Sequence, residues 1–164
     1  MALLQRLPKD HSIREFRRAA FSRIREAKYL ALADHRLAAI YFSGYAVEMI
    51  LKAAYFRVCG RGRNDPISLK EILDVKPNDA KSLSVTWPGN AHDLVSWANV
   101  LVARRKALKT PYKAAFARSL VSRVKRIARC WKEDLRYWSR RPYRGEVQVT
   151  FQATEWLIGQ ERFL

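Results

Sequence analysis

Residues 34–60 read DHRLAAIYFSGYAVEMILKAAYFRVCG, and this stretch decides the fold. Its apolar residues occupy nearly every face of a helix instead of one stripe, so other helices must surround it at the centre of a bundle. Asp34 is expected to cap its start, and Gly60 is the glycine that commonly follows a helix C-terminus. The longest apolar run, residues 37–51, has 15 residues and includes Glu48. A membrane span needs about 20 residues with few charges, so a buried core helix is favoured.

Helical patterns on both sides of this stretch supply its neighbours. The sequence SIRE at residues 12–15 is a capping box, and apolar residues then recur at spacings of three and four. A helix is expected over residues 92–108, where leucines and a tryptophan recur with the same spacing. The longest helix is expected from the Thr110–Pro111 start signal to about Trp138. The final stretch, residues 145–164, fits a helix or a strand, and helix is preferred because a lone strand would have no partner.

Residues 60–90 differ from the rest, because four turn signals interrupt them. They leave room only for a short helical turn at SLKEIL, so an irregular surface excursion is expected there. The chain has 164 residues and suits one domain spanning residues 1–164. The predicted fold class is therefore all-α, an antiparallel up-down bundle of four to five helices.

Charge is the strongest functional signal in the sequence. Lysine and arginine total 32 against 15 acidic residues, a net charge of +17, which indicates an anionic partner such as nucleic acid. Residues 104–144 alone carry 15 basic and 2 acidic groups. On one continuous helix, five of these cations would lie within about 60° of each other, opposite an apolar face. These candidate nucleic-acid-binding residues are Arg118, Lys125, Arg129, Lys132 and Arg136.

A solvated basic face is the alternative interpretation of this helix. Like charges so closely spaced repel by a few tenths of a kcal/mol each, which favours a phosphate-binding face instead. Binding to a membrane surface is disfavoured, because the tryptophans and leucines that would insert face the bundle. The N-terminus has too short an apolar run for a signal peptide, so a cytoplasmic location is expected.

Few residues suggest catalysis or metal binding. Cys59 and Cys130 form no CxxC motif, so neither a zinc site nor a disulfide framework is expected, and no cofactor motif occurs. Glu48 in the apolar helix must be paired, either with Lys52 one turn later or with a cation from another helix. The resulting ion pair of Glu48 is either a structural pair within the bundle or part of a functional groove. His92 stands just before Asp93, which suits the positive end of the helix that follows.

These segments together resemble the HEPN family (higher eukaryotes and prokaryotes nucleotide-binding). The resemblance is carried by HRLAAIYFSGYAVEMILKAAY at residues 35–55, HDL at residues 92–94 and DLRYWSRRPY at residues 134–143, in that order. It implies a helical bundle that usually forms a homodimer and is often encoded beside a minimal nucleotidyltransferase, as in toxin–antitoxin systems. Members include RNA-cleaving toxins, noncatalytic RNA-binding versions and auxiliary domains.

Catalytic members carry an arginine followed, after four to six residues, by a histidine. Arg136 matches the arginine, but residues 141–143 are Arg, Pro and Tyr, so the histidine is missing. The sequence therefore favours a noncatalytic HEPN-like dimer that binds RNA or nucleotides, with Arg136 and Tyr137 at its cleft beside Glu48 and Lys52. One alternative is a ribonuclease toxin that uses Arg136 with Tyr143 or His92. The other is a protein-interaction module for an acidic partner such as a nucleotidyltransferase.

Overall fold

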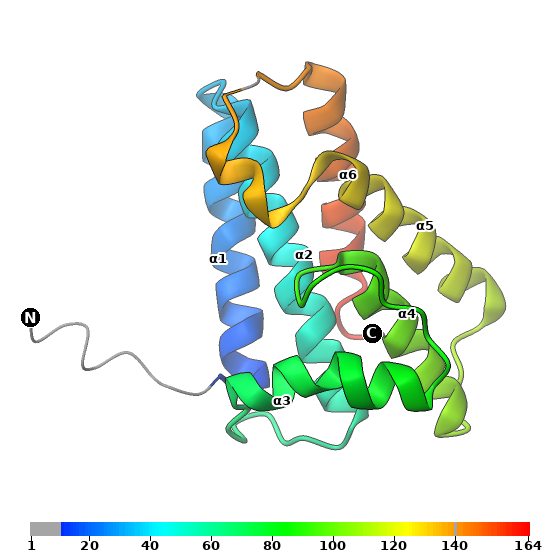
Figure 1. The fold of residues 1–164 in the computed structure, drawn as a ribbon. Helices are drawn as coiled ribbons and strands as arrows, with labels where there is room; N and C mark the ends of the chain where they lie inside the picture. The colour runs from blue at the N-terminus through cyan, green and yellow to red at the C-terminus, as the bar shows by residue number, and fades with distance from the viewer. Residues whose placement is uncertain (1–10, 140) are drawn as a thin grey trace, which may run out of the picture.

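The computed structural model describes residues 11–139 and 141–164, and within these residues the fold is an all-helical bundle (Figure 1). It has six α-helices, where four to five were expected, because the excursion contains a helix of its own. They are α1 (Ile13–Leu32), α2 (Arg36–Val58), α3 (Leu69–Asp74), α4 (Leu94–Ala107), α5 (Ala114–Cys130) and α6 (Arg144–Gly159). A π-helix, η2 (Val75–Ala80), and a 3-10 helix, η3 (Glu133–Tyr137), complete the chain. The all-α prediction, including the helix near the C-terminus, is confirmed.

Helix α2 lies at the centre, as its apolar surface requires. It contacts α1, α4, α5, α6 and η3, and more than half of its residues are buried. It pairs with α1 in antiparallel fashion, and α5 pairs with α6 in the same way (Figure 1). Among the described helices, α2 alone is long and apolar enough to cross a membrane, and 67% of its most apolar window is buried inside the bundle. A core helix of a bundle has the same properties, so this test is weak evidence for a membrane span.

Local signals set most helix ends. Ser12 accepts a hydrogen bond from the Glu15 amide at 3.2 Å and so caps α1. Gly60 adopts a φ of 85° just after α2, a conformation that favours glycine. Asp34, however, does not cap α2. His35 occupies that position, and the Asp34 side chain pairs instead with Arg36 and Arg141.

The expected helix from Thr110 to Trp138 is wrong at both ends, and α2, not this helix, is the longest. Helix α5 begins at Ala114, with Lys113 at the N-cap, so Thr110 and Pro111 do not start it. It ends at Cys130, and Trp131 is extended, with φ −124° and ψ 134°. The Trp131 indole packs against Gly44 of α2 and donates from Nε1 to the Tyr41 carbonyl at 3.0 Å. This contact with α2 holds Trp131 at the point where the chain leaves the helical path and re-forms as the short η3.

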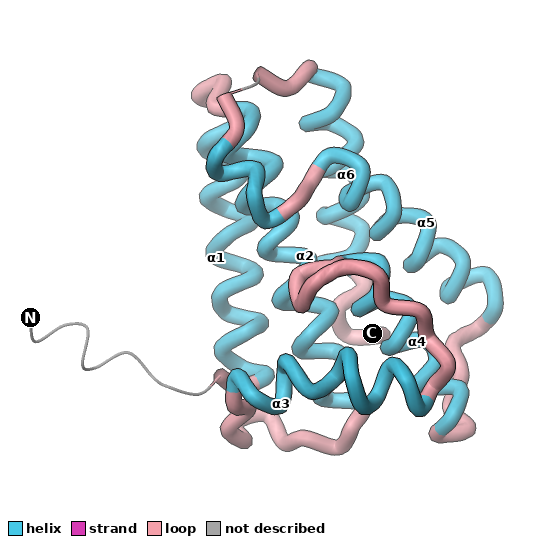
Figure 2. The backbone as a smooth tube through the Cα atoms, in the orientation of Figure 1, coloured by secondary structure: helices cyan, strands magenta, loops and turns pink. Residues whose placement is uncertain are grey.

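The excursion at residues 60–90 is more ordered than its turn signals indicate. A capping box between Ser68 and Glu71 starts α3, which runs directly into η2. Pro77 lies inside η2, where its missing N–H cannot complete the α-helical hydrogen-bond pattern. Asp79 of η2 accepts hydrogen bonds from Tyr55 at 2.5 Å and Arg104 at 2.6 Å, which dock η2 against α2 and α4. The irregular part is confined to the loops on either side, one of which crosses the front of the bundle before α4 (Figure 2).

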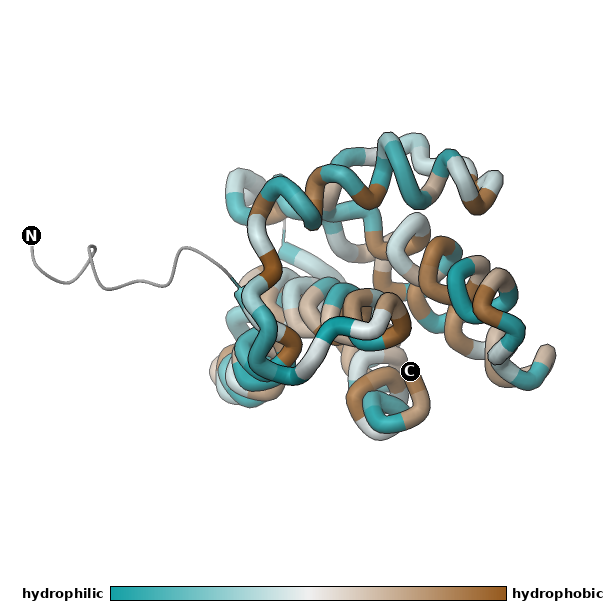
Figure 3. Tube along the Cα trace, turned by 90° about the horizontal axis from the view of Figure 1, so that it is seen from below, coloured by the Kyte–Doolittle hydropathy of each residue, from teal (hydrophilic) through white to brown (hydrophobic). Residues whose placement is uncertain are grey.

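Helices α1 and α5 are the amphipathic helices of the bundle. Viewed from below, the bundle shows both hydrophilic and hydrophobic residues along its helices (Figure 3). Helix α5 is the clearest case, because Leu120, Val124 and Ile127 are buried on one side while four of its five cations are exposed on the other. The apolar side predicted for α5 is therefore confirmed up to the point where the helix ends.

Replacing Gly44 with alanine is expected to destabilise the protein by about 1–3 kcal/mol, because the new Cβ overpacks the interface. An ideal Cβ at this position would stand 2.1 Å from Cδ1 of Trp131, and that indole is buried. Gly145→Ala is the matched control, because no atom lies within 4 Å of its Cβ position. It should leave stability unchanged or raise it by up to about 1 kcal/mol. Urea unfolding measures both, and equal stabilities for the two variants would contradict the packing described for Trp131.

Candidate functional site

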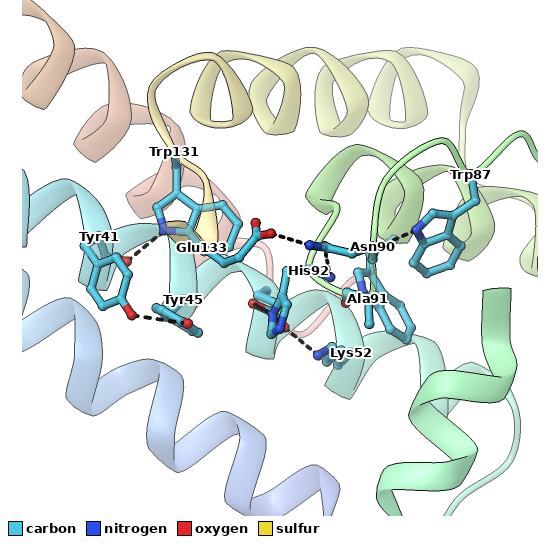
Figure 4. Close-up of polar contacts among 11 residues, drawn as sticks. Tyr41, Tyr45, Lys52, Trp87, Asn90, Ala91, His92, Trp131 and Glu133 are labelled. Carbon is cyan, nitrogen blue, oxygen red and sulfur yellow. Dashed lines mark hydrogen bonds and ion pairs between the residues drawn. The ribbon is translucent and has the colours of Figure 1, made fainter. Parts of the chain in front are cut away.

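One face of α2 carries a row of polar side chains in an otherwise apolar helix. Tyr41, Tyr45, Glu48 and Lys52 are separated by four, three and four residues, which places them on the same side. Tyr41 donates to the Tyr45 hydroxyl at 3.3 Å, and the Tyr45 ring meets the edge of the His92 ring with centroids 6.4 Å apart. The row faces η3 and the loop that precedes α4 (Figure 4).

Glu48 is the centre of this row, and it is only 3% exposed. Lys52 Nζ lies 2.5 Å from Glu48 Oε1, and His92 Nδ1 lies 3.0 Å and 3.1 Å from the two carboxylate oxygens. Lys52 is itself buried, with its ammonium 5.4 Å from the centroid of the Trp97 ring. Both pairings that the sequence left open are therefore present, and the buried charge is fully compensated.

These contacts perturb both titratable partners. Burial acts to raise the pKa of Glu48, but hydrogen bonds from His92 and Lys52 outweigh it, so the pKa lies below the ordinary value. The hydrogen bond to Glu48 raises the pKa of His92, against a smaller opposing effect of burial. Because a carboxylate only accepts hydrogen bonds, Nδ1 of His92 is the donor. His92 thus keeps its positive charge to a higher pH than a free histidine does.

Three hydrogen bonds hold the loop that presents His92. Trp87 Nε1 donates to the Asn90 carbonyl at 2.8 Å, and the Asn90 side chain accepts from the His92 amide at 2.9 Å. Trp97 Nε1 donates to the Ala91 carbonyl at 2.9 Å (Figure 4). On the other side, Asp93 accepts from two backbone amides and caps α4, as predicted. The imidazole is therefore fixed from both ends, by its backbone and by Glu48.

A hollow of about 650 Å³ opens in front of His92, and we call it the loop hollow. It lies between the loop at residues 86–93, the start of α4 and the end of α5. His92, Lys125 and Lys132 contribute its basic groups, while Asp93 and Glu133 contribute acidic groups. The Glu133 carboxylate accepts a hydrogen bond from the Asn90 side chain. The loop hollow thus combines three basic side chains with two carboxylates that already accept hydrogen bonds within the chain.

A second hollow, also of about 650 Å³, runs along α5, and we call it the α5 groove. Arg118, Lys125, Arg126 and Arg129 line it, and Val102 of α4 contributes to its wall. All four cations are exposed, and within residues 11–139 and 141–164 none of them forms an ion pair with a carboxylate. Helix α5 carries five arginines and lysines and no aspartate or glutamate. Lys125 lines both hollows, so the two form one continuous basic surface.

The structure divides the five predicted nucleic-acid-binding residues among three places. Arg118, Lys125 and Arg129 lie together in the α5 groove. Lys132 and Arg136 follow the break in α5, so they do not share its face. Lys132 lines the loop hollow, and the Arg136 guanidinium stacks on the Tyr137 ring at 4.8 Å.

The other predicted residues are also separated. Tyr137 is 76% exposed, whereas Glu48 and Lys52 are buried, and no contact among the described residues joins Tyr137 to either of them. Tyr143 is 75% exposed at the start of α6, where its amide donates to Glu146 at 2.7 Å. No contact among the described residues brings Arg136, Tyr143 and His92 together.

Two site features were missed from the sequence. Arg126 lies in the α5 groove, and its helical angle, about 80° from Arg118, could have included it. The bond between His92 and Glu48 joins residues 44 positions apart, and no local pattern signals it. Only the packing of the loop on α2 reveals that pair.

The described residues contain no group of three or more histidine, cysteine, aspartate or glutamate side chains that could hold a metal ion. Comparisons with protein-family models, with curated proteins and with solved structures find no match to this chain. The site must therefore be interpreted from its own geometry and charge.

Replacing Glu48 with glutamine is expected to lower the free energy of unfolding by about 3–5 kcal/mol, because it leaves the buried Lys52 ammonium without a counter-charge. The double variant E48Q/K52M should recover much of this loss, since it removes both charges. Urea unfolding at neutral pH measures both.

The matched control is the Lys70–Asp74 pair of α3, which has the same four-residue spacing but lies at the surface. Asp74→Asn should cost less than about 1 kcal/mol. A loss of the same small size for Glu48→Gln would show that the Glu48 pair does not support the core.

Proposed function

We propose that this protein binds RNA through the phosphate backbone and that the α5 groove is its principal contact surface. One observation carries the proposal: four exposed cations without carboxylate partners in the described chain line one groove on a helix that has no acidic residue. Such an arrangement destabilises the free protein slightly through repulsion between like charges. A polyanion bound in the groove would relieve that repulsion and release its own counterions.

The dimensions of the groove favour a polymer over a single nucleotide. Arg118 and Arg129 are separated by three helical turns, which corresponds to roughly 16 Å along the helix axis. One phosphate group cannot contact cations over that length, whereas consecutive phosphates of a strand can. Three of the four cations are arginines, and their planar guanidinium groups suit two-point contacts with phosphate oxygens.

The resemblance to HEPN proteins supplies the more specific parts of the proposal. It favours RNA over DNA, a cytoplasmic homodimer, and a nucleotidyltransferase encoded nearby as a protein partner. We propose a noncatalytic role, because the histidine that follows the arginine in ribonuclease members is absent after Arg136. Cleavage of the bound RNA would instead favour a ribonuclease toxin. Binding of an acidic protein without affinity for RNA would favour an interaction module.

Binding of a labelled oligouridine is expected to weaken steeply with salt. Four phosphate contacts give a slope of roughly −3 in log K against log salt on a single strand. Removing three of these contacts in the variant R118Q/R126Q/R129Q should flatten the slope by about 2, because binding then releases fewer counterions from the RNA. Fluorescence anisotropy over a series of salt concentrations measures both slopes.

A matched control separates the groove from net charge. The variant R14Q/R18Q/R25Q removes three arginines from α1, which lies on the other side of α2 from α5 (Figure 1). Both variants lose the same charge, so the control should keep most of the slope. Equal flattening in the two variants would contradict a localised binding surface, and no binding by the unmodified protein would exclude RNA as the ligand.

A further inference from the structure

We infer that the loop hollow is a second phosphate-binding site, in which His92 donates a hydrogen bond from Nε2 to a phosphodiester oxygen and Lys125 and Lys132 supply the accompanying charge. This inference rests on the proposed binding of RNA. It extends that function from a basic groove to a defined subsite, because Lys125 joins the α5 groove to the loop hollow.

The orientation of His92 is the first argument. Its Nδ1 is committed to Glu48, so Nε2 is the nitrogen left for a ligand. The side chain is 40% exposed and lines the loop hollow. Within the described residues, Nε2 has no hydrogen-bond partner and is not a buried unsatisfied atom. A histidine held this firmly, with one nitrogen open to a hollow, is preorganised to donate to a ligand.

The charges around His92 are the second argument. Three carboxylates approach it, and each has a partner: Glu48 of α2 pairs with Lys52, Asp93 caps α4, and Glu133 of η3 accepts from Asn90.

The remaining neighbours of His92 add positive charge or none. Tyr45 of α2 is neutral at physiological pH, since burial raises the pKa of its hydroxyl. Lys125 and Lys132 remain without a carboxylate partner in the described chain. An anion that enters the loop hollow therefore meets two lysines that pair with no carboxylate of the described chain, beside a His92 that shares Glu48 with Lys52.

Protonation of His92 controls this site. The hydrogen bond to Glu48 raises the pKa of the imidazole, so its contribution is fully present below the pKa of a free histidine. The contribution is lost as the pH rises through the raised value, because neutral His92 keeps its proton on Nδ1 for Glu48 and Nε2 becomes an acceptor. Phosphate binding in the loop hollow should therefore weaken at alkaline pH.

The first test titrates the three histidines of the chain by proton NMR of their imidazole rings. The probe is the dinucleotide UpU, whose single phosphodiester keeps its charge throughout the titration. Adding UpU should raise the pKa of His92 further, because the phosphate stabilises the charged ring. His92→Gln removes one resonance and so assigns it. An unchanged pKa of His92 in the presence of UpU would overturn the inference.

The second test measures oligouridine affinity against pH. The unmodified protein should bind roughly tenfold more weakly at about pH 8.5 than at about pH 6, as expected for loss of one charge-assisted hydrogen bond. His92→Gln should bind weakly at both values. His92→Lys, which keeps its charge, should bind tightly at both. His35→Gln is the matched control and should behave like the unmodified protein.

The two proposals fail separately. The same loss of affinity with pH in His92→Gln as in the unmodified protein would overturn the subsite, while the salt slope of R118Q/R126Q/R129Q still tests the α5 groove. A shift of the His92 pKa by UpU in a protein that does not bind oligouridine would support the loop hollow as a phosphate site and overturn the proposed function alone.

Discussion

The carboxylate of Glu48 is the constraint on which the rest of the site depends. It lies inside the most apolar helix of the bundle, where an unpaired charge would be very costly. Lys52 reaches it from the next turn of the same helix, and among the residues that the structure describes the second oxygen is satisfied by His92 alone, from a distant loop. Correct folding of α2 in the bundle therefore requires that loop to close over it. The position of the loop is then set by the electrostatics of the core as well as by its own turn residues.

The charges of helix α5, unlike that of Glu48, lie at the surface and are not paired with carboxylates of the described chain. The cations of α5 lie outside the bundle and have no carboxylate partner among the described residues, while Leu120, Val124 and Ile127 attach the helix to α4 and α6 through apolar contacts. The apolar side of α5 thus stabilises the bundle, and the cationic side makes no contact that the fold requires. The two strategies meet at Lys125, where the α5 groove adjoins the hollow in front of His92. The basic surface therefore has two parts: His92, which is held by the paired Glu48 of the core, and the lysines and arginines of α5, which have no carboxylate partner in the described chain.

Much of the fold could be predicted from the sequence, because its signals are local. The central helix, the Ser12 cap, the Asp93 cap and the helix near the C-terminus follow from periodicity and capping residues. The errors arose where tertiary contacts override local patterns. Helical periodicity continues past Cys130, but the contact of Trp131 with α2 ends the helix. The helical turn at SLKEIL is present as α3, but Pro77 and the turn residues around it gave no signal for its continuation as η2, which Asp79 and buried side chains hold in place.

The site was less accessible to prediction than the fold. The basic residues of α5 could be found, since helical spacing alone groups them. The partnership between His92 and Glu48 could not, because it depends on how a loop packs on a helix 44 residues earlier in the sequence. The HEPN resemblance directed attention to Arg136, whereas the geometry singles out a histidine from another segment.

Gly44 has a consequence beyond its own packing. Because it lacks a side chain, the indole of Trp131 can sit directly against the backbone of α2. The length of α5 is therefore encoded partly in a different helix, at a position with no charge and no contact with any proposed ligand. A larger residue there would displace the tryptophan, lengthen or re-aim α5, and rotate Lys132 relative to Lys125. The spacing of Lys125 and Lys132 along this surface thus depends on how Trp131 packs against α2 in the core.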